Sequence, residues 1–132
     1  MNMKIIKATS KHTKDVGRLF DLYRQFYKYN PELTKSTKYI KERISKKDST
    51  IFVCYQDKEA CGFVQLYETF DSLNINKKLI LYDLYVKETF RKQRIGRKLM
   101  NTAKKFAVKK KIKIIELLFT IKVMAYPHSI KI

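Results

Sequence analysis

The chain has 132 residues, 45% of them apolar, which is the size and composition of one globular domain, residues 1–132, with a buried core. Its formal net charge of +18 favours an anionic ligand, although a composition biased toward lysine would give the same charge. No apolar run approaches the ~20 residues that span a bilayer, so we expect no membrane association, and we also expect no signal peptide.

The first part of the chain predicts a strand followed by two helices. Residues 4–8 have a strand-like pattern, and from Thr13 apolar residues recur at the three- and four-residue spacing of a helix. Asn30-Pro31 should end that helix, because the residue before a proline avoids the helical region. A second helix is expected at residues 36–45.

Three strands should follow, at residues 50–56, 60–70 and 78–86. Short turns link them, so they should be antiparallel neighbours. Gly62 in the second of these strands permits a bulge or a close backbone approach. The two cysteines, Cys54 and Cys61, lack the spacing of metal ligands and are too few for a disulfide framework. We therefore expect reduced core thiols, no metal and a cytoplasmic location.

The last part of the chain contains the most informative stretch. A basic loop follows the strand at 78–86, Gly96 opens an amphipathic helix that runs to about Lys110, and an apolar strand is expected at 112–120. The span 87–113 holds 12 basic residues and one acidic residue. Because the N-terminus of a helix carries unpaired N–H groups and a positive dipole end, this loop predicts a phosphate site. The two strands around the helix should be parallel.

The sequence LYDLYV followed by FRKQRIGRKLM resembles the GNAT superfamily of acetyl-CoA-dependent N-acetyltransferases. The loop pattern of that family is R/Q-x-x-G-x-G/A; here Arg91 takes the first position, Gly96 the last, and Arg94 replaces the middle glycine. The resemblance covers residues 5–119. It implies an α/β fold with a mixed, mostly antiparallel sheet, a splay between the fourth and fifth strands, and helices on both faces.

The resemblance also implies how acetyl-CoA would be held. Backbone N–H groups of the loop would hold its pyrophosphate, and the backbone of Leu84 and Val86 would pair with its pantetheine arm. The guanidinium of Arg94 is itself able to bind phosphate. The residues implied in acetyl-CoA binding are Leu84, Tyr85, Val86, Arg91, Lys92, Gln93, Arg94, Ile95, Gly96 and Arg97.

Acetyl transfer to an amine requires a neutral amine, a polarised thioester carbonyl and an acid for the leaving thiolate. Asp83 is the candidate base or amine anchor, because burial in an apolar strand would raise its pKa. A structural salt bridge or a solvent-facing position would explain Asp83 equally well. Tyr67, Glu68 and Asp71 are further candidates for binding a cationic amine. In the family the amine attacks directly, so neither cysteine is assigned as a nucleophile.

The C-terminal residues depart from the family pattern. The family has a further helix whose tyrosine protonates the leaving thiolate, whereas here Pro127 follows Tyr126 and would break a helix. We therefore do not assign the acid role to Tyr126, and we expect a truncated or divergent member with an atypical short C-terminus. Residues 129–132 have the pattern of a strand that pairs with their own sheet or with a second molecule. An open sheet edge or an exchanged tail would give a homodimer.

The expected function is transfer of an acetyl group from acetyl-CoA to a primary amine of a small molecule or peptide, by direct attack. One alternative is a catalytically impaired relative that still binds coenzyme A. A second alternative is a basic nucleic-acid-binding domain. It is less favoured, because the sequence has no aromatic-rich RNA-binding motif, no GXXG loop and no zinc knuckle.

Overall fold

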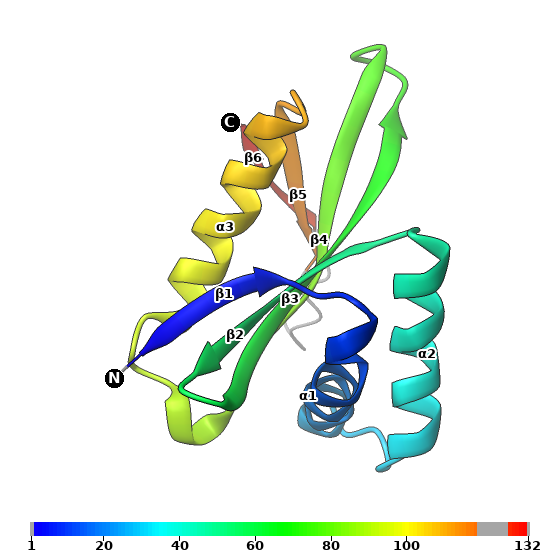
Figure 1. The fold of residues 1–132 in the computed structure, drawn as a ribbon. Helices are drawn as coiled ribbons and strands as arrows, with labels where there is room; N and C mark the ends of the chain where they lie inside the picture. Colours follow the sequence, from blue (N-terminus) through cyan, green and yellow to red (C-terminus); the bar gives the residue numbers. More distant parts are fainter. Residues whose placement is uncertain (1, 119–126, 132) are drawn as a thin grey trace.

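The computed structural model describes residues 2–118 and 127–131, in which a mixed sheet has helices on both faces (Figure 1). The strands follow one another across the six-stranded sheet in chain order. They are β1 (Met3–Lys7), β2 (Thr50–Gln56), β3 (Glu59–Asp71), β4 (Asn76–Val86), β5 (Ile114–Leu118) and β6 (Pro127–Lys131). Neighbours are antiparallel except β4 and β5, which are parallel. The expected mixed, mostly antiparallel sheet is confirmed.

Two helices cover one face of the sheet and a third covers the other (Figure 1). The helices are α1 (Thr13–Phe26), α2 (Leu33–Lys46) and α3 (Ile95–Lys109). Strand β2 shows why both faces need cover, since successive side chains of a strand point to opposite faces. Ile51 and Val53 belong to the core beneath α1 and α2, whereas Phe52 and Cys54 belong to the core beneath α3. Both faces of β2 are apolar and both are buried.

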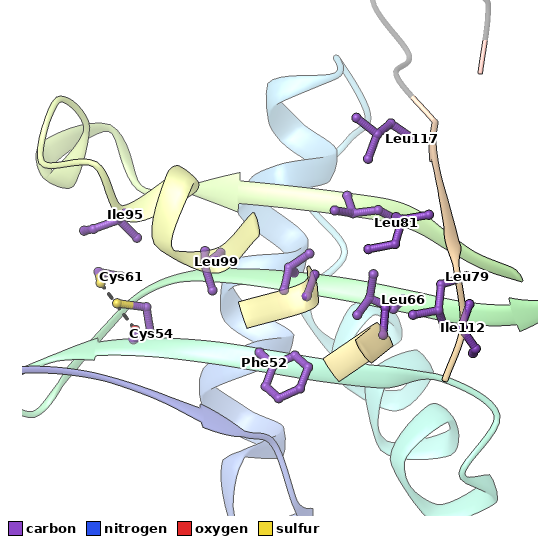
Figure 2. Close-up of a cluster of buried hydrophobic side chains, with 14 residues drawn as sticks. Phe52, Cys54, Cys61, Leu66, Leu79, Leu81, Ile95, Leu99, Ile112 and Leu117 are labelled. Carbon is purple, nitrogen blue, oxygen red and sulfur yellow. Dashed lines mark hydrogen bonds between the residues drawn. The ribbon is translucent and has the colours of Figure 1, made fainter. Parts of the chain in front are cut away.

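Helix α3 closes the second core with side chains at a four-residue spacing (Figure 2). Ile95, Leu99, Ala103 and Ala107 are all fully buried along one side of the helix. Leucines of β3 and β4 and Ile115 of β5 complete this cluster. The crossover from β4 through α3 to β5 therefore has the parallel arrangement that the sequence predicted.

The two cysteines lie in the same core as free thiols (Figure 2). The Sγ of Cys61 donates to the backbone oxygen of Cys54 at 3.3 Å. Burial raises the pKa of both thiols, that of Cys61 to about 12. Buried, protonated thiols are inert, as the sequence led us to expect.

Strand β3 bends beside Cys61. The register with β2 shifts between Cys54 and Tyr55 and leaves one extra residue on β3. A Cβ added to the neighbouring Gly62 would lie 3.0 Å from the backbone oxygen of Tyr85, so no larger residue fits there without a shift. Both features that the sequence permitted at Gly62, a bulge and a close backbone approach, are present.

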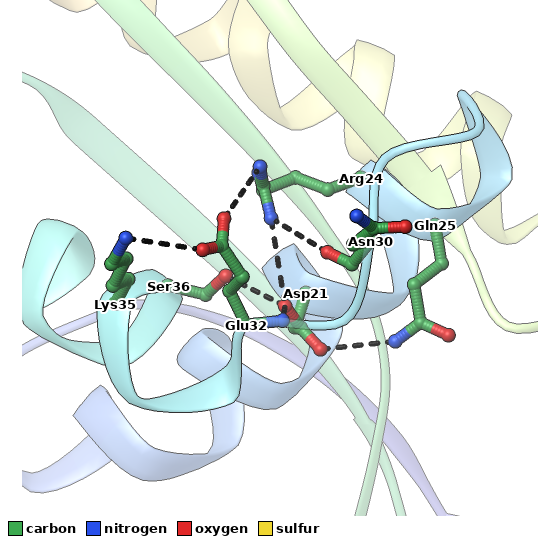
Figure 3. A network of polar contacts seen from close by, with 7 residues as sticks. All are labelled: Asp21, Arg24, Gln25, Asn30, Glu32, Lys35 and Ser36. Carbon is green, nitrogen blue, oxygen red and sulfur yellow. Dashed lines mark hydrogen bonds and ion pairs between the residues drawn. The ribbon is translucent and has the colours of Figure 1, made fainter.

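A buried carboxylate joins α1 to α2 (Figure 3). Asp21 Oδ1 accepts the backbone N–H of Glu32 at 2.9 Å and the Ser36 hydroxyl at 2.8 Å. Its Oδ2 accepts Nε2 of Gln25 at 2.9 Å, and Arg24 lies 3.8 Å from Oδ1. Asp21 thereby fixes the start of α2 against the second half of α1.

Left-handed lysines follow the helices, and α1 ends earlier than the sequence suggested. Helix α1 ends at Phe26, before Pro31, and Lys28 has a φ of 70°. The N–H of Tyr29 bonds to the oxygen of Arg24 at 3.0 Å, a Schellman arrangement. Helix α2, expected at 36–45, extends over Leu33–Lys46, and Lys47 after it is also left-handed.

The same arrangement follows α3 and moves the start of β5. Lys111 has a φ of 60°, and the N–H of Ile112 bonds to the oxygen of Ala107 at 2.9 Å. Ile112 therefore closes the helix, and β5 begins at Ile114 rather than at the expected position 112. The expected end of this strand, at position 120, lies outside the described residues.

The C-terminal strand pairs with the chain's own sheet. Strand β6 lies antiparallel to β5, from Ile114 opposite Lys131 to Leu118 opposite Pro127. Of the two arrangements that the sequence left open for this strand, pairing with its own sheet or with a second molecule, the structure has the first. Tyr126, to which the sequence assigned no acid role, lies outside the described residues.

Candidate functional site

The basic loop runs from the end of β4, through the short helix η2 (Glu88–Phe90), to the start of α3. Lys92 and Arg94 both have left-handed backbones, with φ of 68° and 62°. Arg94 is the N-cap of α3, and its backbone oxygen accepts the N–H of Lys98 at 3.0 Å. The arginine at the glycine position of the motif thus has the left-handed backbone conformation, which glycine adopts more readily than other residues do.

A cavity of about 500 Å³ opens between this loop and the end of β4. It is lined by Leu84, Val86, Phe90, Arg91, Lys92, Arg94, Ile95, Gly96 and Arg97. All of these except Phe90 were predicted as acetyl-CoA-binding residues from the sequence. Phe90 lies between the strand and the loop pattern, where no motif position marks it.

Two predicted residues do not line this cavity. Gln93 lies in the loop outside the lining, and the ring of Tyr85 packs on the opposite face of the sheet. The Tyr85 ring lies 6.1 Å from that of Tyr23 and 6.4 Å from that of Phe26, both on α1.

Arg91 ties the loop to its surroundings. Its Nε donates to the backbone oxygen of Val86 at 2.9 Å. Its guanidinium lies over the rings of Phe26 and Tyr85, at 5.3 and 5.5 Å from their centroids. Arg91 therefore holds the loop against β4 and α1 from one edge of the cavity.

Gly96 lines the cavity at the first turn of α3. A Cβ added there would meet only Val86 Cγ2, at 4.0 Å, which is an ordinary contact. Its φ is not positive either, so neither packing nor backbone conformation requires a glycine. The absence of a side chain leaves the N–H groups of this turn open to a ligand, as in other sites where glycine lets a backbone approach pyrophosphate.

One edge of β4 faces away from β3 next to this cavity. The N–H of Lys87 bonds to the oxygen of Cys61 at 2.9 Å, so Lys87 belongs to a hydrogen-bonded pair with β3. Alternation then directs the backbone groups of Leu84 and Val86 away from β3. Within the described residues, β4 pairs with β5 over Leu79–Leu81. The splay expected beside Leu84 stays a prediction, because the positions that follow β5 lie outside the described residues.

A bulge in β4 turns two consecutive side chains to the same face. Gln65 pairs with Asp83 and Leu66 with Leu81, which leaves Tyr82 as the extra residue. Leu81 and Leu84 both pack toward α3. Tyr82 and Asp83, between them, lie on the face that α1 and α2 cover.

Asp83 is buried on that face, with 5% of its surface exposed. Its Oδ2 accepts Nε2 of Gln65 at 2.7 Å, and Gln65 Oε1 accepts the Ser49 hydroxyl at 2.9 Å. Burial raises the pKa of Asp83 above its usual value, and hydrogen bonds from Gln65 and Tyr23 oppose part of that rise. No Lys or Arg in the described part of the chain forms an ion pair with it. Asp83 is thus neither solvent-facing nor in a salt bridge there.

A second cavity, of about 470 Å³, lies above Asp83. Its lining residues are Phe20, Tyr39, Tyr67, Glu68, Thr69, Ile80, Tyr82 and Asp83. Tyr67 and Glu68 were candidates from the sequence. Asp71 was also a candidate, but it lies outside this lining and accepts the amide of Asn74 at 2.7 Å in the β3–β4 turn.

Asp83 lines the second cavity and Leu84, the next residue of β4, lines the first, on the opposite face of the sheet. Phe20 and Tyr39 come from α1 and α2, whose packing on the sheet the sequence did not specify residue by residue. In residues 2–118 and 127–131, no three His, Cys, Asp or Glu side chains gather as a metal site. No helix in the same part of the chain is both long enough and apolar enough to cross a membrane.

Known proteins are similar to this chain in sequence and in fold. The model of the acetyltransferase (GNAT) family matches residues 16–125. The uncharacterized N-acetyltransferase YhfO of Bacillus subtilis is 32% identical over 105 residues, which are 80% of this chain and 70% of that protein. A crystal structure of a probable acetyltransferase has a TM-score of 0.82 at 31% identity, over 89% of this chain and 80% of the other.

A more distant structure shares the fold alone. A predicted acetyltransferase from Clostridium acetobutylicum, solved with acetyl-CoA, has a TM-score of 0.75 at 14% identity. The match covers 89% of this chain and 81% of that one.

Proposed function

We propose that this chain, which belongs to the GNAT acetyltransferase family, transfers an acetyl group from acetyl-CoA to a primary amine of a small molecule or peptide. The observation that carries the proposal is Gly96, a glycine that the fold itself does not require, at a helix N-terminus that faces a basic cavity. The cavity volume of about 500 Å³ is within the range of small-molecule sites, which is ~300–1,000 Å³.

The residues around this cavity fit the anionic end of acetyl-CoA. The first N–H groups of α3, from Ile95 to Arg97, have no acceptor within the helix, and the dipole is positive at this end. The side chains of Lys92, Arg94 and Arg97 add positive charge around them. The backbone groups of Leu84 and the N–H of Val86 face away from β3 and suit an extended, amide-containing arm, which would pair with them as a strand does. The Val86 oxygen already accepts Nε of Arg91. When bound, acetyl-CoA supplies an activated acyl group as a thioester.

Asp83 is suited to remove a proton from the acceptor amine. A raised pKa makes its carboxylate a stronger base than an exposed aspartate, and general bases work best when their pKa lies near the working pH. Gln65 and Tyr23 hold the carboxylate as hydrogen-bond donors and are positioning residues in this scheme. The neutral amine then attacks the acyl carbon directly, the C–S bond of the thioester breaks, and the leaving thiolate takes the proton that the nitrogen loses, so no nucleophilic side chain is required.

A Gly96→Ala variant tests the donor site. Its free energy of unfolding should stay the same or rise by up to about 1 kcal/mol, because alanine is the better helix former and the Cβ has room. Its affinity for acetyl-CoA, measured by calorimetry, should fall at least about tenfold, because the methyl group stands where the pyrophosphate would approach. Lys109→Ala, at the far end of α3, is the control and should bind acetyl-CoA as the wild type does.

Thermal shift and thiol release separate the alternatives. A ligand at 100 times its Kd stabilises the folded state by about 2.7 kcal/mol, which is easily measured. Stabilisation by oligonucleotides but not by acetyl-CoA, with a steep salt dependence, would contradict the proposal and favour a nucleic-acid-binding domain. Stabilisation by coenzyme A without thiol release from any amine would indicate an impaired relative.

Two further parts of the proposal concern where the protein acts and how it assembles. We place it in the cytoplasm, because both buried cysteines are free thiols, as is usual in reducing compartments. A homodimer through a sheet edge remains a proposal, supported by the edge positions of β1 and β6 in the described sheet. Light scattering on the purified chain measures the mass that decides it.

A further inference from the structure

We propose that the cavity above Asp83 is the acceptor site and that it selects monoamines whose amino group is carried on an aromatic body. This inference rests on the proposed function and adds the substrate class. Three features support it: the aromatic rings that line the cavity, the number of carboxyl groups that have no cation and can bind an ammonium group, and the position of Asp83 in the lining.

Four aromatic side chains from four different elements wall the cavity. They are Phe20 of α1, Tyr39 of α2, Tyr67 of β3 and Tyr82 of β4. The rings of Phe20 and Tyr39 are stacked, with centroids 5.3 Å apart and planes at 12°. The rings of Tyr67 and Tyr82 meet edge to face, at 5.6 Å and 81°. Such walls favour a flat apolar ligand, because each aromatic pair adds ~0.5–1.5 kcal/mol to the burial of its area.

The polar groups of the lining are largely occupied by one another. The hydroxyls of Tyr39 and Tyr67 are 2.8 Å apart and hydrogen-bonded. Glu68 Oε1 lies 3.3 Å from Nζ of Lys110, so that carboxylate already has a cation. A ligand with many hydroxyl or amino groups would lose its hydration here and find few replacements, which makes amino sugars poor acceptors.

Asp83 is then the one lining carboxyl without an ion-pair partner among the described residues. One ammonium group can be neutralised there, and a second would lie in a domain of net charge +18. Arg43 adds a local positive charge, because its guanidinium lies 4.7 Å from the centroid of the Tyr39 ring. The single unpaired carboxyl group of Asp83 therefore favours a monoamine and disfavours a polyamine.

The place of Asp83 orients such a ligand. Asp83 lies next to Leu84, which lines the donor cavity on the other face of the sheet. An amino group bound at Asp83 would thereby lie one residue along β4 from the lining of the donor cavity, and the body of the amine would lie among the rings. Tyr82, with 47% of its surface exposed, is the ring best placed to contact it.

The test compares amines that differ in one property, with acetyl-CoA as donor and thiol release as the readout. We expect kcat/KM for 2-phenylethylamine to exceed that for ethylamine by roughly 30-fold or more, the expected effect of burying a phenyl group. Spermidine and kanamycin should both be poorer acceptors than 2-phenylethylamine. Faster acetylation of either of them would overturn the inference and leave the proposed acetyl transfer in place.

A pair of tyrosine variants locates the effect. Tyr82→Ala should lower kcat/KM for 2-phenylethylamine about tenfold more than it lowers kcat/KM for ethylamine. Tyr29→Ala, an exposed tyrosine outside the cavity, should change neither. An equal loss on both amines in Tyr82→Ala would overturn the inference.

Binding without turnover gives an independent readout. With coenzyme A present, 2-phenylethylamine should raise the melting temperature of the wild type, and it should raise that of Tyr82→Ala by less. Absence of that difference contradicts the substrate class. Absence of any thermal shift with acetyl-CoA itself would contradict the proposed function, and the substrate class, which rests on that function, would be contradicted as well.

Discussion

At the scale of single residues, ionisation of the buried Asp83 carboxyl group lowers the free energy of unfolding, so its effect depends on pH. Its carboxyl group is buried against neutral donors, so the folded state holds its proton more tightly than the unfolded state does. The stability that this proton confers is complete below the unfolded pKa of about 3.8 and is lost as the pH rises through the raised folded pKa. The charged form of Asp83, which the proposed proton transfer requires, is thus the form that destabilises the folded state.

Replacement by asparagine should separate stability from activity. Asp83→Asn keeps the shape and accepts the same hydrogen bonds, so its free energy of unfolding should rise relative to the wild type as the pH increases from 4 to 8. Each pH unit between the two pKa values of Asp83 corresponds to about 1.4 kcal/mol. Urea unfolding at several pH values measures this difference. Over the same range kcat/KM for an amine should fall at least about 100-fold with no change in acetyl-CoA affinity; a constant stability difference would contradict the burial argument.

Arg94 combines a backbone cost with a charge. A left-handed backbone costs a non-glycine residue ~1–2 kcal/mol. Arg94→Gly should therefore have a free energy of unfolding about 1 kcal/mol higher than that of the wild type. Its affinity for acetyl-CoA should nevertheless fall about five- to tenfold, because a guanidinium–phosphate contact is lost.

Chemical denaturation and calorimetry on the same variant measure both effects of Arg94→Gly. Lys111→Gly is the matched control for the backbone, since Lys111 is also left-handed but lies outside the cavity lining. Unchanged affinity in Arg94→Gly would show that the side chain takes no part in binding.

At the scale of elements, Asp21 shows how two helices are held at a fixed angle by one carboxylate. Burial alone would raise its pKa, but the hydrogen bonds from Glu32, Ser36 and Gln25, with the charge of Arg24, lower it overall. The stability conferred by the charged form is therefore present above the unfolded pKa and is lost as the pH falls through the folded one.

Asp21→Ala should lower the free energy of unfolding by about 2–4 kcal/mol, because it leaves a buried hydroxyl and a backbone N–H without their acceptor. Ser36→Ala removes a single donor and should cost about 1 kcal/mol. Denaturant unfolding at pH 7 and pH 3 measures both, and the difference between wild type and Asp21→Ala should narrow at the lower pH. A difference that stays constant would show that the charge of Asp21 is not what stabilises the joint.

The type and order of the elements followed from periodicity and turns, but several of their ends did not. Glycine is the usual signal for a helix C-terminus, and this chain has three glycines, none of them with a positive φ. Lys28 and Lys111 take the left-handed positions instead. Lysine carries no local preference for that conformation, so α1 and α3 end where tertiary packing dictates.

At the scale of the whole molecule, net charge should control the encounter with an anionic substrate. A domain of charge +18 attracts the phosphates of acetyl-CoA over several ångströms, and added salt screens that attraction. The Kd for acetyl-CoA should therefore rise about tenfold between 50 and 500 mM NaCl. Titration calorimetry at several salt concentrations measures it, and the Kd of a neutral fragment such as N-acetylcysteamine should stay constant.

The donor half of the site was predictable from the sequence and the acceptor half largely was not. The loop from Arg91 to Arg97 is continuous in sequence, so its strand, glycine and helix can be recognised together. The acceptor cavity draws Phe20, Tyr39 and Tyr82 from three elements. Their meeting depends on how α1 and α2 pack and on the register of β4, which no local pattern specifies.

The extra residue in β4 has a consequence for how this domain can change. An insertion within a regular strand would turn every later side chain to the wrong face, but the bulge at Tyr82 absorbs it, so Leu81 and Leu84 still reach the same core. Position 82 is therefore free of both cores while it lies in the wall of the acceptor cavity. Substitutions there can alter which amine is accepted at little cost to folding, so specificity and stability can evolve separately at this point of the chain.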